Sequence, residues 1–176
     1  MPTEEEERDE KILEIIIKAY EFEWDQKEKI DTKLNNFVAI ATTVATLNTG
    51  VGFFVLERVP SRNPYFIPLV VTLVIGVALF VLSVIVSLLG YRPLKYQATP
   101  RDTLKIIDTY KTLKKAYIIR EVATTMAEAT NWNMQINKRK AKMLQLVFWI
   151  LASGALSLVV FTICLSLALG TPVIDP

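Results

Sequence analysis

The sequence predicts an all-α membrane protein in which three transmembrane helices carry long cytoplasmic helical extensions packed as a bundle. Three observations predict this class. Three long apolar runs contain much of the apolar sequence, the charged residues lie outside them, and the polar residues 4–36 and 101–142 beside two of the runs have helical periodicity without Gly or Pro. Apolar residues make up 52% of the 176 residues, close to a globular protein, so their distribution carries the prediction.

The three apolar runs comprise residues 37–56, 66–89 and 143–169, and none of them contains a charged residue. Each run exceeds or matches the roughly 20 helical residues that cross a hydrocarbon core. Helices are expected because a backbone in lipid must satisfy its own hydrogen bonds. Residues 57–65 contain Pro60 and Pro64 and are too short for anything but a tight connection. Residues 37–89 are therefore predicted to form a transmembrane hairpin.

Basic residues predict the orientation of these spans. Segment 1–36 contains 6 Lys and Arg and segment 90–142 contains 12, whereas loop 57–65 contains two and tail 170–176 none. Cytoplasmic segments carry the excess of Lys and Arg. We therefore expect a multi-pass protein of the cell membrane with a cytoplasmic N-terminus and an external C-terminus.

Both cytoplasmic segments are expected to form amphipathic helices. Segment 1–36 has an apolar stripe that continues without Gly or Pro into the first span, which predicts one long helix or two nearly collinear helices. Gly90 and Pro93 are expected to end the second span, and a second stripe begins at residue 104. Asn131–Asn133 leave open whether 101–142 is one helix or two. The stripes comprise Leu13, Ile16, Ile17, Tyr20 and Trp24, and Leu104, Ile107, Tyr110 (or Ile106), Leu113, Tyr117, Ile118, Val122 and Met126.

The two cytoplasmic segments have opposite charge. Segment 1–36 has 12 acidic and 6 basic residues, net −6, and segment 90–142 has 12 basic and 4 acidic residues, net +8. The first and third spans run in the same direction, so their cytoplasmic extensions are expected to lie side by side. Each exposed ion pair contributes only ~0–1 kcal/mol, so the apolar stripes are expected to supply most of the packing energy.

The composition argues against an enzyme. The chain has no His, its one cysteine (Cys164) lies in an apolar run, and it has no Gly-rich phosphate loop. A single cysteine forms neither an internal disulfide nor a thiolate metal site. We therefore expect no catalytic, cofactor-binding or metal-binding residues and no nucleic acid partner.

Two groups of residues are candidates for a site. Thr42, Thr46, Asn48 and Thr49 give the first span a polar face, which either lines a pore in an oligomer or supports helix packing. Lys138, Arg139, Lys140 and Lys142 lie just before the third span. These basic residues either contact an anionic lipid headgroup or ligand or serve only as a topology anchor.

Two stretches resemble a known family. Residues 20–47 combine a charged helix, Asp31-Thr-Lys33 and a span, and residues 129–156 combine Asn residues, a basic cluster and a span. This pattern is similar to the small multi-span membrane effectors of prokaryotic nucleotide-signalling defence systems, the SLATT and Pycsar-type membrane effectors. The resemblance implies a helical membrane domain that oligomerises and perturbs the membrane when triggered.

Two functions are therefore open. The first is a structural or interaction module, a homo-oligomer embedded in the lipid bilayer whose cytoplasmic arms bind a protein partner. The second is a pore-forming or membrane-disrupting effector of a nucleotide-signalling defence system.

Overall fold

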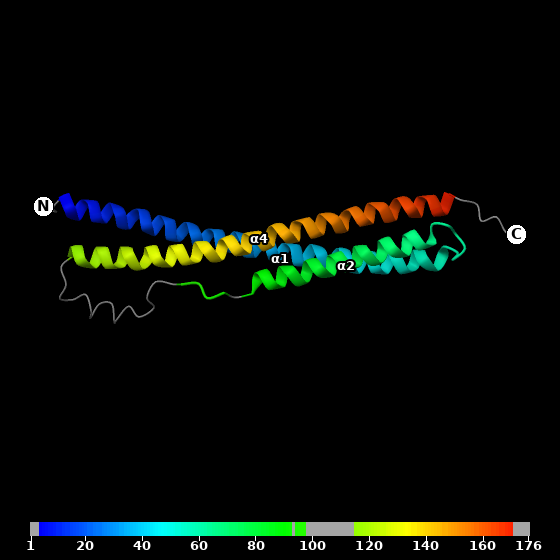
Figure 1. Cartoon of the computed structure of the whole chain (residues 1–176), viewed down its shortest axis with the longest axis horizontal. Helices are drawn as coiled ribbons and strands as arrows, with labels where there is room; N and C mark the ends of the chain where they lie inside the picture. Colours follow the sequence, from blue (N-terminus) through cyan, green and yellow to red (C-terminus); the bar gives the residue numbers. More distant parts are fainter. Residues whose placement is uncertain (1–3, 93, 98–114, 171–176) are drawn as a thin grey trace. The chain divides into compact units, whose positions relative to one another are not determined.

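The computed structural model of the chain consists of three helices: α1 (Glu4–Arg58), α2 (Phe66–Tyr91) and α4 (Lys115–Gly170) (Figure 1). The structure describes residues 4–92, 94–97 and 115–170, and every regular element in these ranges is a helix. The expected all-α class is therefore confirmed for the described residues. Pro93, the start of the second apolar stripe (residues 104–113) and tail residues 171–176 lie outside them.

The chain divides into two compact units. Unit 1 comprises Met1–Asp31 and Pro93–Ala141, and unit 2 comprises Thr32–Arg92 and Lys142–Pro176. Unit 1 is thus built from the first part of α1, the short segment 94–97 and the first part of α4. Unit 2 is built from the second part of α1, all of α2 and the second part of α4.

Helix α1 is a single helix of 55 residues. Of the two alternatives for residues 4–56, one long helix is therefore the observed one. The sequence favours it because Gly and Pro are absent from residues 4–49, and because Glu4, Glu5, Glu6 and Glu7 in the first turn meet the positive end of the helix dipole. Helix α4 is likewise continuous over 56 residues and passes through Asn131–Asn133 without a break.

Helix α2 matches the predicted second span closely, and it ends at Tyr91, between the two residues that were expected to end it, Gly90 and Pro93. No described glycine has a positive φ, so Gly90 does not form a left-handed cap. Arg92 instead leaves the helix at φ −48° and ψ 131°, the extended conformation that a residue before proline prefers. Gly90 lies inside the helix, where an added Cβ would lie 3.2 Å from Leu34 and 3.4 Å from Met143.

Three helices pack together in unit 2, with α2 antiparallel to the other two (Figure 1). Gly52 of α1 contacts Leu73, and an added Cβ on Gly154 of α4 would lie 3.1 Å from the ring of Phe80. These small residues let the helix backbones approach one another. A cluster of buried side chains closes the end of this unit near the α1–α2 loop: Val59, Leu69, Leu73, Phe161 and Ala168.

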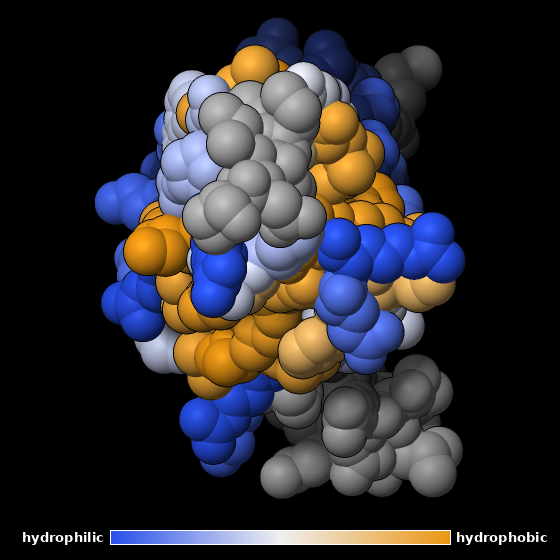
Figure 2. Space-filling model, turned by 90° about the vertical axis from the view of Figure 1, so that its right-hand side faces the viewer, coloured by the Kyte–Doolittle hydropathy of each residue, from blue (hydrophilic) through white to orange (hydrophobic). Residues whose placement is uncertain are grey.

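The outer surface of unit 2 is predominantly apolar. Each helix contains an 18-residue window long and apolar enough to cross a membrane, and only 17–28% of the residues in these windows are buried. Large apolar side chains such as Phe53, Ile67 and Leu156 are more than 60% exposed. Figure 2, which faces the end of unit 2 that carries the α1–α2 loop, shows apolar side chains at the surface with hydrophilic ones between them. Such a surface suits lipid rather than water.

Candidate functional site

The most elaborate polar cluster of the described residues lies in unit 1, where segment 94–97 is bound to α4. The side-chain amide of Asn133 accepts a hydrogen bond from the Gln97 backbone N–H and donates one to the Gln97 carbonyl, each 3.1 Å long. The side chain of Asn133 thereby pairs with both backbone groups of Gln97, as the backbone of a neighbouring strand would. Trp132 Nε1 adds a 2.9 Å hydrogen bond to the Lys95 carbonyl.

Tyr96 lies at the centre of this cluster. Its hydroxyl donates a 2.8 Å hydrogen bond to Asn137 Oδ1, and Asn137 Nδ2 in turn donates to the carbonyl and the carboxylate of Glu23 at 2.8 and 2.7 Å. The Tyr96 ring lies 5.8 Å from that of Trp24. The ammonium of Lys27 lies 4.4 Å from the Trp24 ring centre and 4.8 Å from the Tyr96 ring centre, a cation–π arrangement.

A buried ion pair completes the cluster. Lys140 Nζ donates a 2.6 Å hydrogen bond to Asp31 Oδ1, and the Lys140 side chain is 3% exposed. Burial, and then the charges of Asp31 and Glu23, raise the pKa of Tyr96 to about 12, because each effect disfavours a phenolate. The Lys140 ammonium also lies 5.5 Å from the centre of the Tyr96 ring, so hydrogen bonds, an ion pair and cation–ring contacts together join α1, segment 94–97 and α4.

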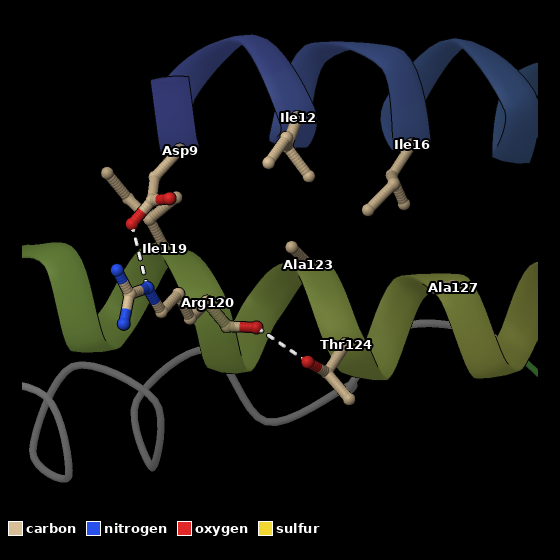
Figure 3. A pocket seen from close by; sticks show the side chains of 8 residues that line it. All are labelled: Asp9, Ile12, Ile16, Ile119, Arg120, Ala123, Thr124 and Ala127. Carbon is tan, nitrogen blue, oxygen red and sulfur yellow. Dashed lines mark hydrogen bonds and ion pairs between the residues drawn. The ribbon is translucent and has the colours of Figure 1, made fainter. Parts of the chain in front are cut away.

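An open groove of about 370 Å³ lies elsewhere in unit 1, between α1 and α4. Figure 3 shows Ile12 and Ile16 pointing from α1 toward Ala123 on α4, with Asp9 and Arg120 at one end. Arg120 Nε donates a 2.8 Å hydrogen bond to Asp9, and its guanidinium also binds Glu5. Asp9 first, and then Glu5, raise the pKa of Arg120. The groove therefore has an apolar floor and one charged end.

The opposite charges of the two predicted arms do meet in unit 1. Besides the Asp9–Arg120 and Asp31–Lys140 pairs, Lys115 Nζ lies 2.5 Å from Glu10 Oε1. The Lys115 and Glu10 side chains are 62% and 49% exposed, so this pair adds little stability. Asp9 and Lys140 are nearly buried, and their pairs fix the alignment of α1 with α4 more firmly.

The structure divides the predicted basic group. Lys138, Arg139 and Lys142 are exposed, whereas Lys140 is 2% exposed and is bound to Asp31. The side chains of Lys138, Arg139 and Lys142 are therefore accessible to an anionic headgroup. Lys140 instead lies in the cluster around Tyr96, where it binds Asp31 and faces the Tyr96 ring.

The predicted polar face of the first span is also divided. Thr42 and Thr46 are exposed, Thr49 is half-buried, and Asn48 is buried with 8% exposure. The hydroxyls of Thr46 and Thr49 donate to carbonyls four residues earlier, those of Thr42 and Ala45, and these bonds let a hydroxyl face lipid. Asn48 points inward, where its Nδ2 lies 3.3 Å from the position of an added Cβ on Gly76 of α2.

Tyr96, Asn133 and Asn137 were not among the site residues predicted from the sequence. A signal for the two asparagines was present, since they are four residues apart and share a helix face with Ala129 and Ile136. Polar residues on an apolar helix face indicate specific partners. Nothing in the sequence pairs them with Glu23 or with segment 94–97.

The fold and its surfaces define a helical protein with three helices able to cross a membrane. No model of a protein family matches the chain, and no curated protein or solved structure matches it either. Among the described residues, no three Cys, Asp or Glu side chains are grouped as a metal site. The geometry of the two units is therefore the basis for a functional proposal.

Proposed function

We propose that this chain is an oligomeric integral membrane protein that acts as a structural and interaction module. In this proposal unit 2 lies in the bilayer of the cell membrane, and unit 1 lies in the cytoplasm, where its helices bind a second copy of the chain or another protein. The exposed Lys138, Arg139 and Lys142 contact anionic lipid headgroups. The N-terminus is cytoplasmic and the C-terminus external, as the distribution of basic residues predicts.

The apolar groove of unit 1 is the observation that carries this proposal. The polar side chains around Tyr96 are bonded to one another, so that region has few free groups for a partner. The groove, in contrast, leaves Ile12 44% exposed beside Asp9 and Arg120. An apolar floor with a charged end is typical of a surface that receives a helix side chain. We expect a second copy of the chain to occupy it.

Native mass spectrometry of the full-length protein in detergent, with chemical crosslinking as a second readout, tests the proposal. Ile12→Glu places a carboxylate in the groove and is expected to convert oligomer to monomer. Ile15→Glu is the matched control, because Ile15 is 66% exposed and does not line the groove. A monomeric wild type, or equal behaviour of the two variants, would contradict the proposal.

A pore-forming or membrane-disrupting effector is the second candidate, favoured by the hydroxyls on the lipid-facing side of unit 2. Thr42 and Thr46 are exposed among apolar neighbours, so several copies arranged around an axis would present these hydroxyls to a shared interior. The resemblance to SLATT and Pycsar-type membrane effectors adds a prokaryotic defence role to this candidate.

Conductance of the purified protein in liposomes, with and without cyclic nucleotides, tests the pore. Thr46→Val is expected to lower the conductance if Thr46 lines the path. Thr162→Val is the control, since Thr162 is exposed on α4 and makes the same type of backbone bond, to Leu158. Liposomes that never conduct under either condition would exclude the pore.

A further inference from the structure

The groove of unit 1 ends in a group of four charges that sum to zero. Asp9 and Arg120, the charged residues that line the groove, bind each other at 2.8 Å. The Arg8 guanidinium lies 3.6 Å from the Asp9 carboxylate and 3.7 Å from that of Glu5, and Glu5 also binds Arg120. Two guanidinium groups therefore share two carboxylates. Such a group can meet a second copy of itself without the repulsion that like charges produce between two surfaces.

The same groove has both an exposed apolar side chain and space for one. Ile12 is 44% exposed at its edge, and opposite Ile12 and Ile16 the helix α4 contributes the small side chains of Ala123 and Ala127 (Figure 3). The groove has a volume of about 370 Å³, whereas an apolar cavity of about 150 Å³ already holds a benzene ring. An isoleucine side chain therefore fits without displacing the residues that line the groove.

The alignment of α1 with α4 sets the level at which two copies meet. The two helices run in the same direction in unit 1 (Figure 1), and Asp9 lies opposite Arg120. Three residues further along each helix, Ile12 lies at the level of Ala123. In the proposed function both copies cross one bilayer with the same orientation, so their helices are parallel. Ile12 of one copy is then at the level of Ala123 of the other.

We propose that two copies of this chain pair in parallel about a two-fold axis, so that Ile12 of each copy enters the groove of the other and packs on Ala123 and Ala127. This inference rests on the proposed function, and it names the side chain of the second copy that occupies the groove. The pairing is isologous, so the contact between Ile12 and Ala123 occurs twice. It buries both exposed isoleucines and leaves the ion pairs of Asp9 with Arg120 intact.

Disulfide crosslinking between two differently tagged forms of the full-length protein tests this contact in membranes. In a Cys164→Ala background, Ile12→Cys in one form and Ala123→Cys in the other are expected to form a mixed dimer on oxidation, because a disulfide needs Cα atoms within about 7 Å. Glu14→Cys replaces Ile12→Cys in the matched control. Glu14 is exposed and lies about 200° around α1 from Ile12, so its pair with Ala123→Cys is expected to remain uncrosslinked.

A second pair of variants tests the space in the groove. Ala127→Leu fills the groove from α4 and is expected to raise the dissociation constant of the dimer roughly tenfold or more, because it excludes two isoleucine side chains per dimer. Thr125→Leu adds a leucine on the opposite, exposed side of α4 and is expected to leave the dissociation constant unchanged.

The outcomes distinguish this inference from the proposed function. A wild type that is monomeric in native mass spectrometry contradicts both. An oligomeric wild type in which Ile12→Cys crosslinks no better than Glu14→Cys, or in which Ala127→Leu associates as well as Thr125→Leu, overturns only the parallel pairing through Ile12. Preferential crosslinking of Ile12→Cys that Ala127→Leu abolishes is the expected result.

Discussion

Asparagine side chains serve as substitutes for backbone partners in this molecule. Asn133 satisfies both backbone groups of Gln97, and Asn137 joins Tyr96 to Glu23. Asparagine in a helix interior usually competes with the backbone for local hydrogen bonds, which is why residues 131–133 raised the question of a break. Distant partners in unit 1 remove that competition at residues 133 and 137, and α4 continues.

Residues that adjoin one another in the basic cluster are expected to respond differently to substitution. Lys140→Ala leaves Asp31 without its partner and is expected to lower the free energy of unfolding by about 2 kcal/mol, the range for a hydrogen bond to a charged group. Lys138→Ala removes an exposed charge and is expected to change it by less than about 0.5 kcal/mol. Thermal unfolding in detergent measures both.

In lipid binding, Lys138 rather than Lys140 is expected to be the more important residue. Flotation with vesicles that contain anionic lipid is expected to weaken for Lys138→Ala and to remain unchanged for folded Lys140→Ala. Equal losses of stability in the two variants would contradict the distinct position of Lys140.

Tyr96 makes the stability of unit 1 sensitive to alkaline pH. Its pKa is raised from about 10 to about 12 in the folded protein, so the unfolded chain releases this proton first. The contribution of Tyr96 is therefore complete below about pH 10 and declines as the pH rises to about 12. Ultraviolet difference titration of the wild type against Tyr96→Phe is expected to show the ionisation of Tyr96 at this high pH.

The helices themselves followed from the sequence. The predicted spans 37–56, 66–89 and 143–169 lie within α1, α2 and α4, because long uncharged apolar runs leave few alternatives to a helix. The connection between α1 and α2 was also predicted by Pro60 and Pro64. The end of α2 was predicted at the right place from Gly90 and Pro93; Gly90 forms no left-handed cap, whereas Arg92 has the extended conformation that a residue before proline prefers.

The side chain of Asn63 binds the short connection between α1 and α2 to the far end of α4. Asn63 Nδ2 donates a 3.0 Å hydrogen bond to the Ala168 carbonyl, and its Oδ1 accepts one of 2.9 Å from the Tyr65 backbone. Asn63→Ala is expected to cost about 1–3 kcal/mol, since Asn63 is 8% exposed and its partners lose their bonds. Ser61→Ala, on the exposed side of the same loop, is expected to be nearly neutral.

Hydrogen exchange measures this effect locally. Amides near Tyr65 and in the last turns of α4 are expected to exchange faster in Asn63→Ala and at the wild-type rate in Ser61→Ala. Unchanged exchange in Asn63→Ala would show that the apolar cluster around Leu69 and Phe161 holds the loop without help from Asn63.

At the scale of the whole molecule, composition and charge predicted the helices and their ion pairs better than helical spacing predicted the site residues. The apolar excess resolved into three helices, and the opposite charges of the two polar segments led to ion pairs in unit 1. The residues predicted to share a polar or basic face differ in burial, because helical spacing alone does not say which of them contacts a neighbouring helix. Thr46 and Asn48 differ by two positions, yet one is exposed and the other buried.

Membrane orientation is a property of the whole chain, and impermeant thiol labelling tests it. In a Cys164→Ala background, Ser61→Cys is expected to react in intact cells, because loop 57–65 is predicted to be external. Glu21→Cys is expected to react only after the membrane is permeabilised. Labelling of Glu21→Cys in intact cells would reverse the predicted topology.

The surroundings of the glycines determine which of them a larger residue can replace in unit 2. Gly76, Gly90 and Gly154 face side chains of neighbouring helices at 3.1–3.3 Å from an added Cβ, whereas nothing lies within 4 Å at Gly50. Substitution is therefore confined at the first three positions by volume and open at Gly50. Since glycine inside a helix costs about 1 kcal/mol relative to alanine, Gly50 is a reserve of stability that a single substitution would release.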